Sequence, residues 1–115
     1  MRWMSSISAL LAVAVSASPA AGQSALPPDT VTTVVDGDTI PDLGAVGGVA
    51  VDRLGYVYVA DFRNRVWRYE PGGRVVLYAD GLYGTSGNAI GPRGELYQSS
   101  FHGNTISRID RDGSV

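Results

Sequence analysis

Two side chains in this chain of 115 residues could take part in chemistry at a binding site, Asn88 and His102. The carboxamide oxygen of Asn88 is the kind of hard ligand that calcium and other divalent cations accept. His102, the only histidine, could act as a general base, because imidazole is the side-chain group whose unperturbed pKa lies near neutrality. Each has a structural interpretation as well: Asn88 as a turn residue that bonds its own backbone, and His102 as a solvated loop residue.

Several other kinds of site are excluded. The chain contains no cysteine, which rules out disulfides, thiolate metal sites and cysteine nucleophiles. Residues 84–87 have the wrong spacing for a nucleophile elbow, and the chain has no phosphate-cradling loop. A net charge of −2 makes it a poor candidate for binding nucleic acid.

Acidic residues form two short clusters, Asp36-Gly-Asp38 and Asp110-Arg-Asp-Gly113. The second begins like a calcium loop, but neither continues to the distal glutamate that an EF-hand needs. We therefore expect both to be turns between strands. Asp61 is replaced by Ser100 in the repeat described next, and we expect Asp61 to cap or buttress a turn.

A repeat organises the elements that must position these residues. Residues 48–62 and 87–101 are two copies of one passage that begin 39 residues apart, and residues 64–70 align with 104–110. A partial third copy precedes them, because residues 33–37 match residues 77–81. A fixed period of this size is the mark of a repeat architecture.

Each unit predicts four short β-strands separated by glycine-bearing turns. In the first complete unit we expect strands at 49–52, 56–60, 66–69 and 75–79, with turns at 53–55 and 71–73. Four antiparallel strands in about 40 residues describe one blade of a β-propeller. The sequence therefore predicts an all-β fold with about two blades, the second incomplete.

The passage Gly-Val-Ala-Val-Asp-x-x-Gly-x-Val-Tyr-Val-Ala-Asp from Gly48, followed by Asn64-Arg-Val and a glycine turn, resembles the NHL repeat. It is also similar to the SMP-30/gluconolactonase/LRE-like propellers, and the resemblance covers residues 33–115. In the SMP-30/gluconolactonase and paraoxonase-like families an asparagine at the start of an inner strand is a metal ligand, and Ser86-Gly-Asn-Ala-Ile90 is similar to that motif. The resemblance thus implies Asn88 as a ligand to Ca²⁺ or another divalent cation.

Three functions follow from the resemblance. The first is a metal-dependent hydrolase of lactones or related esters, with a small molecule such as a lactone as substrate. The second is a non-catalytic NHL-type propeller that binds a ligand or a protein partner, and the third is an enzyme similar to streptogramin lyases. Gly47 and Gly48 stand where the related lactone hydrolases carry polar residues that contact substrate, so that part of the site is either rebuilt or absent.

The ends of the chain complete the predicted organisation. Residues 1–22 read as a secretory signal peptide, because the apolar stretch is too short and too serine-rich to favour the alternative, an uncleaved membrane anchor; we therefore expect a secreted or periplasmic protein. Residues 23–32 form a linker, and residues 33–115 form the partial propeller. Val115 is the counterpart of Val75, where a fourth strand begins, so we expect a fragment whose remaining blades belong to a longer chain.

Overall fold

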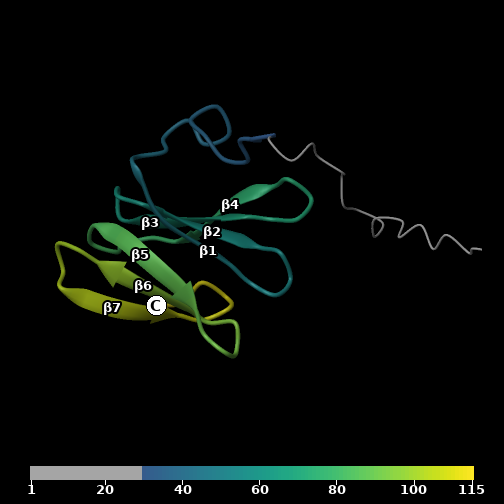
Figure 1. Ribbon diagram of the computed structural model, residues 1–115. Coiled ribbons are helices and arrows are strands. Elements are labelled where there is room, and N and C mark those ends of the chain that lie inside the picture. Colours follow the sequence, from purple (N-terminus) through teal and green to yellow (C-terminus); the bar gives the residue numbers. More distant parts are fainter. Residues whose placement is uncertain (1–29) are drawn as a thin grey trace, which may run out of the picture. The chain divides into compact units, whose positions relative to one another are not determined.

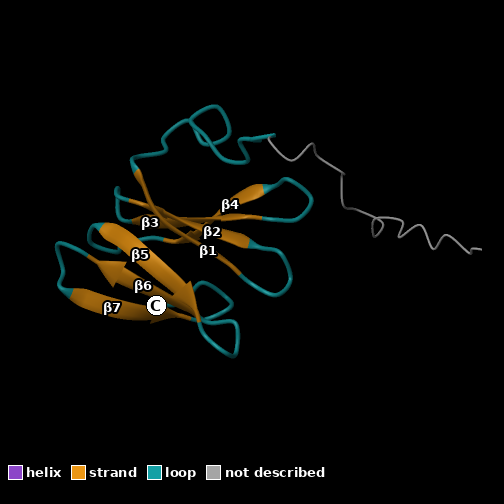
Figure 2. Ribbon diagram, viewed as in Figure 1, coloured by secondary structure: helices purple, strands orange, loops and turns teal. Residues whose placement is uncertain are grey.

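A computed structural model describes residues 30–115, and the folded unit in it runs from Thr32 to Val115. Two antiparallel sheets make up the unit, with no helix among the described residues (Figures 1 and 2). The first sheet has the order β1-β2-β3-β4, with strands Val46–Val51, Val57–Asp61, Arg65–Tyr69 and Val75–Ala79. The second has the order β5-β6-β7, with strands Thr85–Ile90, Leu96–Ser100 and Thr105–Ile109.

The predicted fold class is confirmed: the chain is all-β, and its sheets of four and three strands are those of an incomplete propeller. Residues 33–37, the partial third copy, contain no strand and lead into turns closed by the carboxylate of Asp36, which accepts hydrogen bonds from the N–H groups of Asp38 and Thr39. An outer strand is held by the third strand of its own blade, and no such strand precedes it within residues 30–115.

The predictions for the leader concern residues that the structure does not describe. The signal peptide at 1–22 and most of the linker at 23–32 lie outside the described residues. Within residues 30–115, no helix is long and apolar enough to cross a membrane.

The repeat is visible in the backbone as well as in the sequence. Asn64 and Asn104, at equivalent positions of the two blades, both have positive φ values, 73° and 50°. Asparagine tolerates this left-handed conformation better than most residues, which explains why it occurs at both turns. The second and third strands of each blade are therefore joined by the same kind of turn.

The innermost strands of the two blades, β1 and β5, lie side by side, and glycine makes their close approach possible. Both strands carry a β-bulge at the same point of the repeat, between Val46 and Val49 and between Thr85 and Asn88. A Cβ atom on Gly48 would lie 2.6 Å from the carbonyl oxygen of Ser86. Gly48 thus has a packing role between the blades, at a position where the resemblance left open whether the substrate site is rebuilt or absent.

We expect Gly48→Ala to lower the free energy of unfolding by roughly 1–3 kcal/mol, because the methyl group would meet the backbone of β5. Urea unfolding followed by circular dichroism measures the change. Gly72→Ala is the matched control, because a Cβ at Gly72 meets nothing within 4 Å. An equal effect of the two substitutions would contradict the close approach of β1 and β5.

The hydrophobic core lies between the two sheets. Tyr58 and Val66 of the first sheet pack with Leu96 and Ile109 of the second, and Ala79 and Leu82 complete the cluster. Leu96, Val66 and Ile109 have no exposed surface. The two blades therefore share one core, and each needs the other to bury its apolar face.

Glu70, which follows β3, binds two arginines and gives the fold a pH dependence. Arg74 donates to Glu70 at 2.7 and 3.1 Å and Arg68 donates at 2.8 Å. These hydrogen bonds, from Arg74 first and then from Arg68, lower the pKa of Glu70 from 4.5 to about 2. Because the folded-state pKa is the lower one, the stabilisation is present above pH 4.5 and is lost as the pH falls toward 2.

We expect the difference in urea midpoint between the wild type and Glu70→Gln to be largest near pH 6 and to shrink between pH 4.5 and pH 2. The amide cannot ionise, so only the wild type loses its ion pairs on acidification. Unfolding curves of both proteins at pH 6, 4 and 2 measure this difference. A difference that is constant across the three pH values would show that the ion pairs do not stabilise the fold.

Candidate functional site

Asn88 lies in β5 directly after the bulge, and its side chain points toward the first sheet. Its Nδ2 atom donates to the carbonyl oxygen of Gly48 at 3.3 Å and lies 3.5 Å from the carbonyl oxygen of Tyr58. Its Oδ1 atom is buried and accepts no hydrogen bond. The amide group therefore joins the two blades through its nitrogen and leaves an oxygen unused.

The bulges explain why an amide occurs at this position. A bulge interrupts the ladder and leaves backbone groups without their usual partners. In the second blade the carbonyl oxygen of Gly87 accepts hydrogen bonds from Gln98 Nε2 at 3.0 Å and from Ser99 Oγ at 2.9 Å. The first blade carries the apolar residues Val59 and Ala60 at those two positions. Asn88, from the next blade, donates to the corresponding carbonyl in the first.

The structure adds two polar residues that the sequence analysis did not single out, Gln98 and Ser100. Both lie in β6 and are buried, with 0% and 4% exposure, and both Gln98 Oε1 and Ser100 Oγ lack a hydrogen-bond partner. Gln98 is paired directly with Asn88 across the sheet. The signal was present in the repeat, because Gln98 replaces Val59 just as Asn88 replaces Val49.

His102 lies in the loop between β6 and β7, at the end of the sheet where that loop meets the connection from β4 to β5. Its backbone N–H donates to the carbonyl oxygen of Tyr83 at 3.2 Å. Its ring is exposed and lies 5.4 Å from the ring of Tyr83 and 5.2 Å from that of Phe101. These contacts differ entirely from those of Asn88, so the structure does not join the two predicted site residues through a common neighbour.

Asp61 has the buttressing role that the sequence analysis expected. Its carboxylate is fully buried at the end of β2. Oδ1 accepts hydrogen bonds from the N–H groups of Gly44 (3.2 Å) and Arg63 (2.9 Å). Oδ2 accepts two from the Arg65 guanidinium (3.1 and 2.8 Å) and one from Trp67 Nε1 (3.0 Å).

These hydrogen bonds determine the charge state of Asp61. Burial by itself raises the pKa of a carboxyl group, but the bonds from Trp67, from the backbone of Arg63 and Gly44, and from Arg65 outweigh it and lower the pKa of Asp61. An ionised carboxylate with five donors has little capacity left to accept a proton or a ligand. Asp61 therefore belongs to the scaffold.

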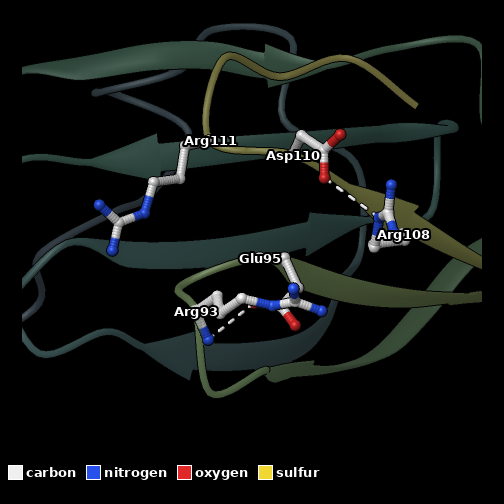
Figure 3. Close-up of a pocket in the computed structure, with 5 residues that line it drawn as sticks. All are labelled: Arg93, Glu95, Arg108, Asp110 and Arg111. Carbon is white, nitrogen blue, oxygen red and sulfur yellow. Dashed lines mark hydrogen bonds and ion pairs between the residues drawn. The ribbon is translucent and has the colours of Figure 1, made fainter.

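A shallow cleft of about 260 Å³ opens at the opposite end of the second sheet, where the hairpin turns lie (Figure 3). Its carboxylates are already engaged: Asp110 pairs with Arg108 at 3.1 Å, and Glu95 Oε2 accepts a hydrogen bond from the N–H of Arg93 at 2.9 Å. Arg111 also lines the cleft. The cleft is thus a partly neutralised surface at the end of the sheet away from His102.

The acidic clusters are turns, as the sequence predicted. Asp36 closes its turn through Oδ1, and Asp112 Oδ1 accepts hydrogen bonds from the N–H of Ser114 at 3.0 Å and from its hydroxyl at 2.6 Å. Within residues 30–115 no group of three or more histidine or acidic side chains is arranged to hold a metal ion. Among the described residues, the buried side-chain oxygens that have no hydrogen-bond partner are Asn88 Oδ1, Gln98 Oε1 and Ser100 Oγ.

Comparison with known proteins finds a match among solved structures, whereas no protein-family model and no curated protein sequence matches the chain. The solved structure of a gluconolactonase from Xanthomonas campestris is similar, with a TM-score of 0.56 and 25% sequence identity over 62% of this chain. The match covers 25% of the gluconolactonase, so this chain spans about a quarter of that protein's length. The likeness supports a lactonase-like propeller.

Proposed function

We propose that this chain forms part of an exported propeller that hydrolyses lactones or related esters with the help of a divalent cation. The observation that carries the proposal is the likeness of its two blades to a gluconolactonase at 25% identity. The signal-like residues 1–22 support export. In this proposal the substrate is a small lactone.

The described residues fit the cation at one point. Asn88 Oδ1 is a buried amide oxygen without a partner, which is the type of ligand calcium prefers. Calcium takes six to eight oxygens, so Asn88 would be one ligand among several, and the others would come from outside residues 30–115. When bound, such a cation polarises a carbonyl group and lowers the pKa of water.

His102 is the proposed base. Its imidazole is exposed at the loop end of the second sheet, where it can reach a ligand in solvent. Near neutral pH a histidine can accept the proton of an attacking water molecule. Asn88 and His102 share no hydrogen-bond partner in the protein, so a substrate that uses both would have to bridge them.

A second function is a non-catalytic propeller that binds a ligand or partner, as NHL-type modules do. The hydrogen bond from Asn88 Nδ2 to Gly48 favours this alternative, because it gives the amide a structural purpose that needs no metal. The two functions predict different effects of calcium. In the hydrolase Asn88 binds the cation, whereas in the non-catalytic propeller Asn88 has a structural role that needs no metal.

Calcium titration calorimetry and δ-gluconolactone hydrolysis in a pH-stat, both carried out on the full-length protein, test the proposal. We expect chelator to abolish hydrolysis, and Asn88→Val to weaken calcium binding at least about tenfold. Valine is a suitable replacement because Val49 holds the equivalent position in the first blade. Asn88→Asp keeps an oxygen ligand and is the matched control. His102→Ala is expected to slow hydrolysis about 10²-fold or more while leaving calcium affinity unchanged.

Three results would count against the hydrolase. Hydrolysis that persists in chelator would remove the metal from the mechanism. Equal calcium affinity in the wild type and Asn88→Val would remove Asn88 from the metal site. No hydrolysis above the buffer rate, with the fold intact, would favour the non-catalytic propeller.

A further inference from the structure

Three arginines have no acidic partner, and all three lie at the end of the sheets where the hairpin turns are. Every other arginine within residues 30–115 forms an ion pair with an acidic side chain. The exceptions are Arg53 in the turn between β1 and β2, Arg93 in the turn between β5 and β6, and Arg111 after β7. Unpaired positive charges thus gather at one end of a chain whose net charge is −2.

Two of these arginines border a second hollow, called here the blade-seam hollow, which has a volume of about 90 Å³. One of its walls is the turn between β1 and β2, and the other is the end of β5 with the turn that follows. Arg111 lines both this hollow and the larger cleft of Figure 3. The side chains that line the blade-seam hollow include Arg53, Arg111, Asp52, Leu54, Ile90 and Pro92.

The guanidinium group of Arg111 is held in place by the turn between β5 and β6. A Cβ atom on Gly94 would lie 2.5 Å from Arg111 Nη2 and 2.7 Å from Nε, so the group rests against this glycine. In Figure 3 the Arg111 side chain points away from Asp110 and Glu95. The structure therefore positions a charged donor without giving it an acceptor, and a donor that is already in place loses little entropy when a ligand binds.

The charge of the blade-seam hollow suits a ligand with a single negative charge. Of the described residues that line it, only Asp52 is acidic, and its carboxylate is already engaged. Oδ1 accepts hydrogen bonds from the N–H groups of Leu54 (2.9 Å) and Tyr56 (3.0 Å), and Oδ2 accepts one from the Tyr58 hydroxyl (3.0 Å). Two guanidinium groups and one carboxylate leave one positive charge, which a monoanion would balance.

The rest of the lining favours an organic ligand. Leu54, Ile90 and Pro92 are apolar, and small-molecule sites combine an apolar lining with a few polar groups that fix the orientation of the ligand. The planar fork of donors on arginine matches the two oxygens of a carboxylate. We propose that the blade-seam hollow binds the carboxylate group of a small organic acid, with Arg53 and Arg111 as the donors. The proposal does not depend on the proposed hydrolase activity, whose residues lie elsewhere.

Both walls of this site belong to the two described blades. A neighbouring blade packs on the face of a sheet and leaves its turns exposed, as the first blade shows. The second sheet packs against the first through the shared core, yet Leu54, in the turn between β1 and β2, is 67% exposed. The remaining blades of a longer chain therefore leave the turn end of this seam open to a ligand.

Calorimetric titration of the full-length protein with butyrate tests the proposal, because butyrate carries one negative charge on a short apolar chain. We expect a dissociation constant of roughly 1 mM for such a small ligand. Arg53→Gln and Arg111→Gln are each expected to weaken binding about tenfold, because each removes hydrogen bonds to a charged group. Arg93→Gln is the matched control: it removes the same charge from the same end of the protein, but Arg93 lines only the larger cleft. We expect it to change the affinity by less than about twofold.

Two further probes identify what the hollow recognises. Neither 1-butanol, which lacks the charge, nor inorganic phosphate, which lacks the apolar chain, is expected to bind measurably at a butyrate concentration that saturates the site. Circular dichroism checks that the variants, which change exposed residues, are folded.

Five results would each overturn the proposal. Three concern the protein: no binding of butyrate to the folded wild type, unchanged affinity in the Arg53 and Arg111 variants, or an equally large loss in Arg93→Gln. Butanol that binds as tightly as butyrate would show that apolar contact alone holds the ligand. Phosphate that binds as tightly as butyrate would make the ligand an inorganic oxyanion instead of an organic acid.

Discussion

Replacing Asp61 by alanine is expected to lower the free energy of unfolding by about 3–5 kcal/mol, which is the effect of removing one partner of a buried ion pair. The carboxylate accepts five hydrogen bonds and has no exposed surface. Without it, the indole N–H of Trp67 loses its acceptor, and the guanidinium of Arg65 keeps only its contacts with Asp42. Urea unfolding at pH 7 measures the loss.

Asp42 provides the matched control, because it binds the same arginine from the other side. Asp42 Oδ2 lies 3.0 Å from Arg65 Nη1, but its side chain is 69% exposed. Exposed ion pairs contribute at most about 1 kcal/mol, so Asp42→Ala is expected to have a small effect. If the two alanine variants were equally stable, the buried position of Asp61 would be wrong.

Leu96→Ala is expected to destabilise the protein by about 2–5 kcal/mol. Leu96 has no exposed surface and packs with Tyr58, Val66 and Ile109 in the core between the sheets. Truncation removes apolar contacts from both blades and leaves a cavity that the rigid sheets cannot easily close. Because small domains have only about 5–15 kcal/mol of stability, a loss at the upper end would leave much of the protein unfolded at 37 °C.

Leu54→Ala makes the same chemical change at a position that is 67% exposed. It is expected to change stability by less than about 0.5 kcal/mol. Thermal and urea unfolding of both variants are compared with the wild type. A larger loss of stability in Leu96→Ala than in Leu54→Ala measures the contribution of core packing. A small effect of Leu96→Ala would mean that the two sheets do not share a core.

The structure also gives Asn88 a purpose that is compatible with either function. Its nitrogen donates to the carbonyl oxygen of Gly48 beside the β-bulge, while its oxygen remains free for a ligand. Valine at this position would remove both interactions at once. Aspartate would keep the oxygen and lose the donor, so the pair of variants separates the structural contribution from the proposed metal contribution.

The sequence by itself determined the strands, the turns and the repeat that relates the two blades. The predicted strands at 56–60, 66–69 and 75–79 agree closely with β2, β3 and β4. Asn64 and Asn104 mark equivalent turns with positive φ. These features depend on local chemistry, namely the β-branched and aromatic residues of the strands and the few residue types that accept a left-handed backbone.

Only the tertiary structure decided which polar groups meet. Asn88 reaches Gly48 across 40 positions of the chain, and Asp61 gains its hydrogen bond from Gly44 across 17. The same packing buries Gln98, whose polarity in an apolar position was visible in the repeat but had no assigned partner. Such contacts depend on how one sheet packs on the next and on where a bulge frees a carbonyl group, and local sequence preferences do not fix either of these.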